Sequence, residues 1–200
     1  MPRRGKPSIT SAAGAYLDPV PEDSALSGLV VLVPEAEPVV ARHRQLLDEN
    51  ASRGAPAHVT VLFPFAPPPA LDEGTLVRVR TAVAAVPAFD HVFRRTAWFG
   101  DDVLWLAPED PGPFRALTSR LHAAFPQHPP FEGRFPDVVP HLTVGHRHPR
   151  PLLEAAEHEL RAALPVGGRA TEVVLLARDT PEDRWAVRAA FPLGRRVSAR

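Results

Sequence analysis

Two short and nearly identical runs constrain the fold of this chain more than any other feature. The first is Ala57-His58-Val59-Thr60-Val61-Leu62-Phe63, and the second is Pro140-His141-Leu142-Thr143-Val144-Gly145. Their histidines, at positions 58 and 141, are 83 residues apart. In this composition a His-x-Thr triplet is expected about 0.4 times, but one with an apolar centre and a following Val only roughly 0.02 times. The pair therefore predicts a repeated structural unit.

Each run has the composition of a β-strand, because it is rich in β-branched residues and is bounded by Pro or Gly. Side chains alternate between the two faces of a strand. Leu62 is therefore predicted beside His58 and Thr60, with Phe63 on the opposite face. The second run places its His and Thr on one face in the same way. Each strand is expected to give one face to the core and an imidazole beside a hydroxyl to the other.

Two such strands facing one another would surround a small space with two imidazoles and two hydroxyls. A neutral His can take a proton from water, a protonated His can give one to a leaving oxygen, and hydroxyls can donate to phosphoryl oxygens. Both forms of His are accessible near neutral pH because its ordinary pKa is about 6.5. A single run is better explained by a surface pair on an amphipathic strand, but the matched pair favours a phosphodiester-cleaving site.

With these motifs the chain resembles the two-histidine (2H) phosphoesterase superfamily, which is marked by two His-x-Thr/Ser-x motifs. More narrowly, it is similar to bacterial proteins labelled 2'-5' RNA ligase or RNA 2',3'-cyclic phosphodiesterase. The resemblance extends from about residue 26 to 194 and includes Val103-Leu104-Trp105-Leu106-Ala107-Pro108. It implies an α/β fold of the α+β type with two lobes. Two pseudo-twofold-related sheets, mixed or antiparallel, would carry outer helices and enclose a central cleft.

The resemblance also implies the active-site residues and their roles. His58 and Thr60 would act together with His141 and Thr143. His58 would be the acid that protonates the leaving oxygen, and His141 the base that activates water. The two threonines would hold phosphoryl oxygens. The expected activity is metal-independent hydrolysis of 2',3'-cyclic phosphate or related cyclic and 2',5'-linked nucleotides, with reverse 2'-5' RNA ligation as a further capacity.

Two alternatives stay open at this point. The same cleft could bind a nucleotide or an RNA terminus without turning it over. A metal-dependent hydrolase could be built around His141, His146 and His148. Strict alternation puts His141 and His146 on opposite faces, and no Cys or nearby carboxylate pattern completes a site. We therefore expect neither a metal nor another cofactor.

Three further residues are candidates for substrate binding. Phe65 and Phe131 lie in predicted loops next to the motifs, where an aromatic ring could stack a nucleobase. Arg134 could contact a phosphate. The alternatives are core packing for the two rings and a solvated surface position for the arginine. The expected partner is a nucleotide or an RNA terminus with a cyclic phosphate.

Composition limits the other classes of function. Lys plus Arg equals Asp plus Glu, at 23 each, so no overall field favours a long nucleic acid. The chain has no cysteine, which excludes disulfides and a Cys nucleophile. No apolar run approaches the roughly 18 to 20 residues that cross a bilayer. We expect a cytoplasmic protein without membrane contact, and a monomer, since nothing suggests an obligate dimer.

Hydrophobic periodicity divides the chain into one domain with two tails. Residues 1–25 are predicted to be a flexible tail, 26–194 a single bilobal domain, and 195–200 a basic tail. The order strand, helix, motif strand, helix, strand occurs at about 27–99 and again at about 103–177. The predicted strands are 28–33, 59–63, 89–99, 103–107, 142–144, 172–177 and 185–191, and the predicted helices are 35–50, 72–86, 113–125 and 152–164.

Overall fold

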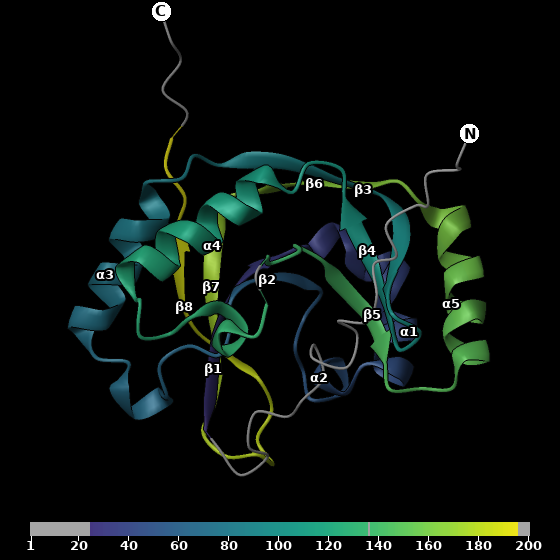
Figure 1. The fold of residues 1–200 in the computed structure, drawn as a ribbon, viewed down its shortest axis with the longest axis horizontal. Coiled ribbons are helices and arrows are strands. Elements are labelled where there is room, and N and C mark those ends of the chain that lie inside the picture. Colours follow the sequence, from purple (N-terminus) through teal and green to yellow (C-terminus); the bar gives the residue numbers. More distant parts are fainter. Residues whose placement is uncertain (1–24, 136, 196–200) are drawn as a thin grey trace, which may run out of the picture.

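The structure is a computed structural model that describes residues 25–135 and 137–195. The predicted tails lie outside the described residues, except for Ala25 and Arg195. Two four-stranded antiparallel sheets form the molecule, with helices packed against them (Figure 1). This architecture confirms the predicted α/β fold with two lobes. Among the described helices, none is long and apolar enough to cross a bilayer.

The first sheet has the strand order β2-β1-β7-β8. Its central strand β1 covers most of the predicted strand 28–33, and all of β1 is buried apart from its half-buried last residue. The first motif strand, β2, lies at one edge. The strands are β1 (Leu26–Leu32), β2 (His58–Leu62), β7 (Glu172–Arg178) and β8 (Ala186–Pro192).

The second sheet has the order β5-β4-β3-β6, with the second motif strand β5 at its edge. Strands β3 and β4 form the predicted hairpin, which turns at Gly100 with a φ of 52°. Strand β6 was not predicted, because Gly167 and Gly168 weaken its strand propensity. The strands are β3 (Phe89–Phe99), β4 (Val103–Pro108), β5 (Leu142–His146) and β6 (Val166–Ala170).

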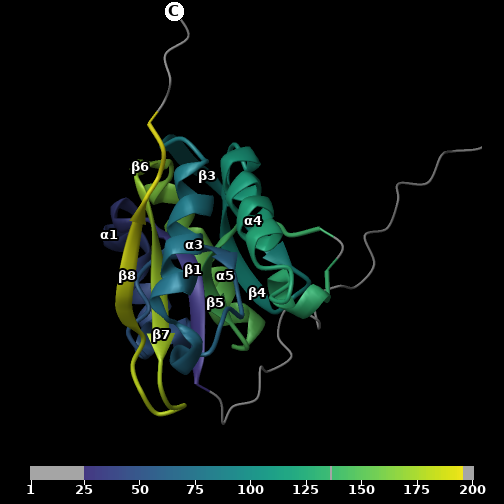
Figure 2. The ribbon, with the colours of Figure 1, turned by 90° about the vertical axis from the view of Figure 1, so that its left-hand side faces the viewer.

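The two predicted repeats exchange elements between the sheets. Strands β1 and β2 pair with each other, but the last strand of their repeat, β3, belongs to the other sheet, while β7 pairs with β1. Seen from the side, β8 and β7 lie toward one side of the molecule, and β4 and α4 toward the other (Figure 2).

Two helices likewise pack against the motif strand of the other repeat. Helix α1 packs against β5 and α5, whereas α4 packs against β2 and α3. The described helices are α1 (Glu37–Leu47), α2 (Glu49–Ser52), α3 (Glu73–Ala84), α4 (Gly112–Ala124) and α5 (Arg150–Ala163). Short 3-10 turns lie at Pro34–Ala36, Pro68–Ala70 and Pro130–Gly133.

One apolar core joins the two sheets. It contains Val31 and Val59 from the first sheet together with Leu104 and Leu142 from the second, all of them inaccessible to solvent. The opposite face of each sheet carries a separate small cluster, Val30, Val174 and Leu176 on the first and Val103, Trp105 and Ala107 on the second. The motif strands β2 and β5 are edge strands that contact one another.

Both motif strands contain a β-bulge directly after the threonine. In the first sheet Val30 pairs with Thr60 but Leu29 pairs with Leu62, so Val61 is the extra residue. In the second, Trp105 pairs with Thr143 but Leu104 pairs with Gly145, so Val144 is the extra residue. A bulge of this kind changes the face to which all later side chains of the strand point.

The bulge corrects the predicted faces of the first motif. Leu62 does not share the face of His58 and Thr60 but is fully buried in the common core. Phe63 moves to the other face, where a Cβ on Gly28 would lie 2.9 Å from its ring.

The same correction applies to the second motif. His146 pairs in register with Val103, which shares the face of Trp105. The prediction that His141 and His146 lie on opposite faces is therefore wrong.

Gly145 is expected to tolerate no side chain. A Cβ built there would lie 2.6 Å from the Cβ of Leu47 and 2.8 Å from Cδ2 of Leu153. We expect Gly145→Ala to lower the free energy of unfolding by roughly 1–3 kcal/mol through overpacking between β5 and α1. Urea denaturation measures this change.

The matched control is Gly167→Ala in β6, where the nearest atoms to a new Cβ lie 3.6 Å away. This variant is expected to unfold within about 0.5 kcal/mol of the wild type. Equal destabilisation by both substitutions would contradict the packing argument.

Candidate active site

His58 and His141 are held in the same way at the starts of the two motif strands. The Nδ1–H of His58 donates to the carbonyl oxygen of Pro56 over 2.6 Å. The Nδ1–H of His141 donates to the carbonyl oxygen of Val139 over 2.7 Å. In each case the acceptor lies two residues upstream. Because these bonds occupy Nδ1, Nε2 of each neutral ring carries the lone pair and is the atom suited to exchange protons.

The structure places the two histidines at the starts of two strands that contact each other, β2 and β5. Thr60 and Thr143 are half-buried and lie two residues beyond their histidines, before the bulges. Both predicted His-Thr pairs thus lie on the sheet faces that point away from the shared core.

The surroundings of both histidines disfavour a charged ring. Burial, followed by the positive charge of Arg44, lowers the pKa of His58 to about 4, against the opposing effects of the Pro56 bond and Asp48. Burial lowers the pKa of His141, against the Val139 hydrogen bond. Both imidazoles are therefore neutral at pH 7 in the free protein.

The charge that acts on His58 comes from a buried ion pair that the sequence analysis missed. Arg44 and Asp48 are 2% and 3% exposed, and Nη2 of Arg44 lies 2.8 Å from Oδ2 of Asp48. The spacing of four residues on one helix was the available signal. Apolar periodicity could not reveal a charged pair that faces the interior.

Asp48 links the end of α1 to the second motif strand. Its Oδ2 accepts from Arg44, while its Oδ1 accepts from the backbone N–H of Asn50 and lies 3.4 Å from Nε2 of His146. Burial by itself raises the pKa of Asp48, but the hydrogen bond from His146 and the charge of Arg44 outweigh it and lower that pKa. The carboxylate therefore stays charged between the two lobes.

Phe65 is not available to a substrate. Its side chain is 4% exposed and packs edge-on against Phe125 and His128, with ring centroids 5.0 and 5.4 Å away. Its backbone N–H donates to the carbonyl of Ser27 over 2.9 Å, so the chain continues along β1 and the ring turns inward. The prediction that Phe65 stacks a base is wrong.

Phe131 and Arg134 lie in the loop before the second motif. The N–H of Phe131 donates to the carbonyl oxygen of Phe63 over 2.6 Å, which fixes this half-buried residue at the end of β2. Nη2 of Arg134 lies 2.5 Å from Oε2 of Glu132. Their roles in substrate binding stay predictions.

A small pocket of about 90 Å³ opens directly beside the first motif. His58 and Thr60 line it together with two aromatic side chains, Phe63 and Trp185. Nε1 of Trp185 donates to Oδ1 of Asn50 over 3.1 Å, and Asn50 also lines the pocket. Phe63 reaches this place because of the bulge, whereas strict alternation places it on the opposite face from His58.

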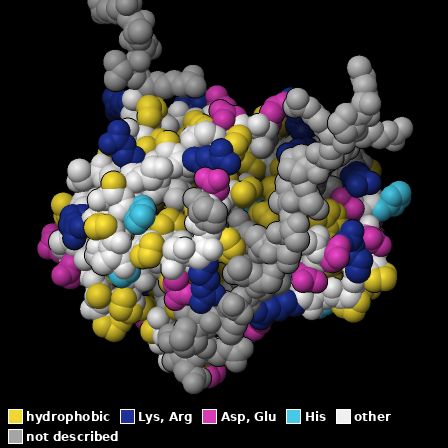
Figure 3. Space-filling model, in the orientation of Figure 1, with side chains coloured by type: hydrophobic (Ala, Val, Ile, Leu, Met, Phe, Trp, Pro, Cys, Tyr) yellow, Lys and Arg dark blue, Asp and Glu magenta, His cyan; other side chains and the backbone are white. Residues whose placement is uncertain are grey.

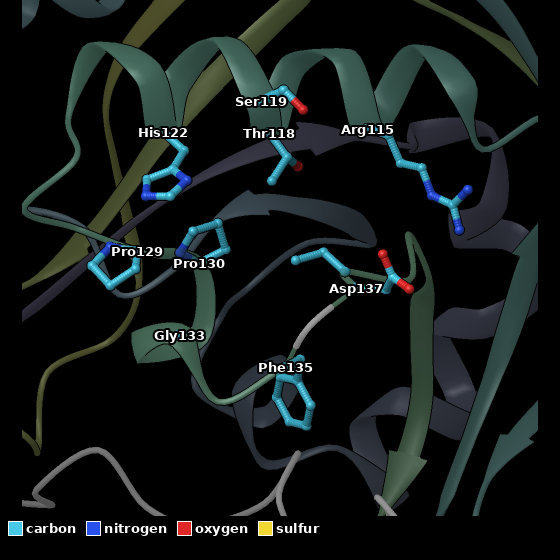
Figure 4. Close-up of a pocket in the computed structure, with 10 residues that line it drawn as sticks. Arg115, Thr118, Ser119, His122, Pro129, Pro130, Gly133, Phe135 and Asp137 are labelled. Atoms are coloured by element: carbon cyan, nitrogen blue, oxygen red, sulfur yellow. The ribbon is translucent and has the colours of Figure 1, made fainter. Parts of the chain in front are cut away.

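A larger pocket of about 350 Å³ lies between α4 and the loop that precedes β5 (Figure 4). Arg115 and Asp137 lie toward one end, and His122 and Pro129 toward the other. None of these residues was selected from the sequence, because a polar helix face and a loop carry no motif. On the face shown in Figure 3, acidic and basic side chains are intermixed rather than gathered in one patch.

The described residues contain no group of three or more His, Cys, Asp or Glu that could hold a metal ion. His141 and His146 share a sheet face, but His146 is directed to Asp48 and His141 to the carbonyl of Val139.

Comparison with known proteins gives a family and a fold. A family model described as the 2'-5' RNA ligase superfamily matches residues 32–182. No curated protein sequence matches the chain significantly.

Solved structures match the chain at low sequence identity. TT0787 of Thermus thermophilus is 19% identical with a TM-score of 0.59, over 86% of this chain and 99% of that chain. E. coli LigT complexed with 3'-AMP is 14% identical, and LigT complexed with NADP+ is 16% identical. Both give a TM-score of 0.52 over the same 86% and 99%.

The lowered pKa of His58 makes stability depend on pH. The unfolded chain binds a proton at an ordinary pKa of about 6.5, whereas folded His58 binds one at about 4. Stability is therefore complete above pH 6.5 and falls as the pH drops toward 4. In the wild type this effect lowers the free energy of unfolding by about 3 kcal/mol between pH 7 and pH 4, and we expect His58→Gln to abolish that part of the decrease. Urea denaturation at the two pH values measures it.

The control is His158→Gln on the exposed face of α5. It should leave the difference between pH 7 and pH 4 as in the wild type. An unchanged pH dependence in His58→Gln would show that His58 is not held neutral by the fold.

Proposed function

Because the chain belongs to the 2'-5' RNA ligase superfamily, we propose that it is a metal-independent phosphodiesterase. Its substrates are 2',3'-cyclic phosphates at nucleotide or RNA ends, or related cyclic and 2',5'-linked nucleotides. The observation that supports this most is the matched pair of imidazoles, each held through Nδ1 by the carbonyl two residues upstream. A metal-free phosphodiesterase needs two such groups, one for each proton.

In the proposed reaction His141 acts as the base. Its Nε2 takes a proton from water while the water oxygen forms a bond to phosphorus. The bond between phosphorus and the ribose 2' or 3' oxygen breaks, and Nε2–H of His58 gives its proton to that oxygen. The hydroxyls of Thr60 and Thr143 donate to the non-bridging oxygens, where negative charge increases. The product is a nucleoside monophosphate or an RNA end with one phosphate.

The substrate itself would help to charge His58. In the free protein Arg44 and burial keep this ring neutral, with a pKa of about 4. A bound phosphate brings negative charge next to the imidazole and raises its pKa, so that the acid is formed in the complex. With an RNA 5'-hydroxyl in place of water, the same displacement would form a bond from the 5' oxygen to phosphorus, open the cyclic phosphate and join the two ends without ATP.

Two observations support a small nucleotide or an RNA terminus as substrate. LigT has been crystallised with 3'-AMP and with NADP+, so a related fold accepts nucleotides. The equal numbers of acidic and basic residues, 23 each, provide no electrostatic track for a long duplex. One chain carries both motifs, so the proposed site needs no second copy and is compatible with a monomer.

A second candidate function is binding without turnover. It is favoured by the neutral state of both imidazoles in the free protein, since no proton donor is present before a ligand arrives. In that case nucleoside monophosphates would bind tightly while no cyclic or 2',5'-linked nucleotide is hydrolysed. Calorimetry together with product analysis separates the two functions.

We expect the wild type to convert 2',3'-cyclic AMP into one monophosphate isomer in the presence of EDTA, as followed by 31P NMR. His58→Ala and His141→Ala should each lower kcat/KM about 100- to 10,000-fold, because each removes one proton-transfer group. His158→Ala on the surface of α5 is the control and should keep full activity. Full activity in either motif variant would rule out the two-histidine mechanism.

The threonine hydroxyls are expected to act in the transition state. Thr60→Val and Thr143→Val keep the side-chain shape but remove a donor, so kcat should fall roughly 10- to 100-fold. Thr81→Val is the control, since its exposed hydroxyl donates to the carbonyl oxygen of Val77 on α3, away from the motifs. A rise in KM with unchanged kcat would instead assign the hydroxyls to ground-state binding.

A further inference from the structure

Trp105 of β4 carries a buried polar hydrogen that the proposed mechanism does not use. Its side chain is 7% exposed, and within the described residues its indole Nε1 has no hydrogen-bond partner. Buried donors are nearly always paired, so an unpaired one calls for an explanation in terms of water or a ligand.

The position of Trp105 relates this donor to the second motif. Trp105 is the cross-strand partner of Thr143 and shares its face, so their side chains are direct neighbours. The ring lies edge-on to His141, with centroids 5.8 Å apart. Phe99 stacks on the indole at 4.6 Å with an angle of 22° between the rings, and it also contacts His141 edge-on at 4.9 Å. The indole is thus packed rigidly beside the two groups proposed to handle the phosphate.

The equivalent place in the first motif has no such donor. Thr60 has Val30 as its cross-strand partner, whereas Thr143 has Trp105. The two halves agree in the His, the Thr, the carbonyl that holds each His and the bulge, but they differ here. The unpaired indole N–H of Trp105 therefore adds a difference between the two sides of the phosphate, besides the different roles proposed for His58 and His141.

We propose that the indole N–H of Trp105 donates a hydrogen bond to a phosphate oxygen of the substrate on the His141 side. This contact orients the cyclic phosphate so that one particular ester oxygen faces His58. Trp105 is then a binding residue that determines which monophosphate isomer is released. The inference rests on the proposed function and adds no covalent step, since the bonds made and broken stay those of the hydrolysis.

The substitution that isolates this donor is Trp105→Phe. It removes the N–H but keeps an aromatic ring next to Phe99 and His141. If the indole served packing alone, phosphate binding and product isomer would be unaffected. Because Phe is smaller than the buried indole and leaves a cavity, the variant is compared with the wild type at a temperature at which both are folded.

The experiment uses the three tryptophans of the chain as probes. With 15N-labelled protein, the indole N–H signal that disappears in Trp105→Phe belongs to Trp105. Titration of the wild type with inorganic phosphate should shift this signal, and Trp105→Phe should bind phosphate about tenfold more weakly. With 2',3'-cyclic AMP, the variant should release a mixture of 2'- and 3'-monophosphate where the wild type releases one isomer.

Trp98→Phe is the matched control. Trp98 lies on β3 with Arg150 stacked 4.1 Å above its ring, and its side chain bonds to Glu157 of α5. It should leave phosphate affinity and product isomer unchanged. A Trp105 signal that does not move at saturating phosphate would overturn the proposal. The proposal would also be overturned if the wild type does not bind phosphate, or if Trp105→Phe binds phosphate as tightly as the wild type. A mixture of isomers released by the wild type would overturn it as well.

Failure of the proposed function would look different. If phosphate shifts the Trp105 signal but no cyclic nucleotide is hydrolysed, the contact stands and the hydrolysis fails. If His58→Ala and His141→Ala stay active while Trp105→Phe changes the isomer, the acid and base assignment fails and the orienting contact stands.

Discussion

The single apolar core between the two sheets is the constraint on which the candidate site depends. Val59 of β2 and Leu142 of β5 are both buried in this core, so apolar side chains of the two edge strands pack in one cluster. Burial of each such side chain contributes about 1.5–3 kcal/mol, and this apolar contact holds the two motif strands together. The His-Thr pairs lie on the opposite faces of the two sheets because the core side chains occupy the others.

The buried charges between the lobes have a different role. A pair such as Arg44 and Asp48 adds little net stability, because desolvation of both ions offsets most of their attraction. Its position nevertheless lets the Arg44 guanidinium add to the effect of burial in lowering the pKa of His58, and lets the Asp48 carboxylate contact His146. The pair thus influences the site through its charges and its position, and it contributes little to the stability of the fold.

The local features of the site could be predicted from the sequence, but its surroundings could not. Composition and the repeated motif were sufficient to place His58, Thr60, His141 and Thr143 on two strands. Alternation then failed beyond Thr60 and Thr143, because a bulge depends on pairing with β1 or β4, which a single strand does not encode. Strand β6 was missed because pairing with β3 overrides the weak propensity of its glycines. Phe65 was misjudged because its backbone bond to Ser27 is a tertiary contact.

The exchange of strands and helices between the repeats also bears on how such a chain arises. The third strand of each repeat pairs with the first strand of the other, as β7 does with β1 and β3 with β4. A single repeat therefore has no complete sheet of its own and leaves two unpaired edges. Two separate copies of one repeat could build three strands of each sheet by swapping their last strands, as in a domain-swapped dimer, whereas β6 and β8 have no counterpart in the first repeat. In this chain the hairpin at Gly100 joins the two halves, so the strand exchange that such a dimer makes between chains takes place within one chain.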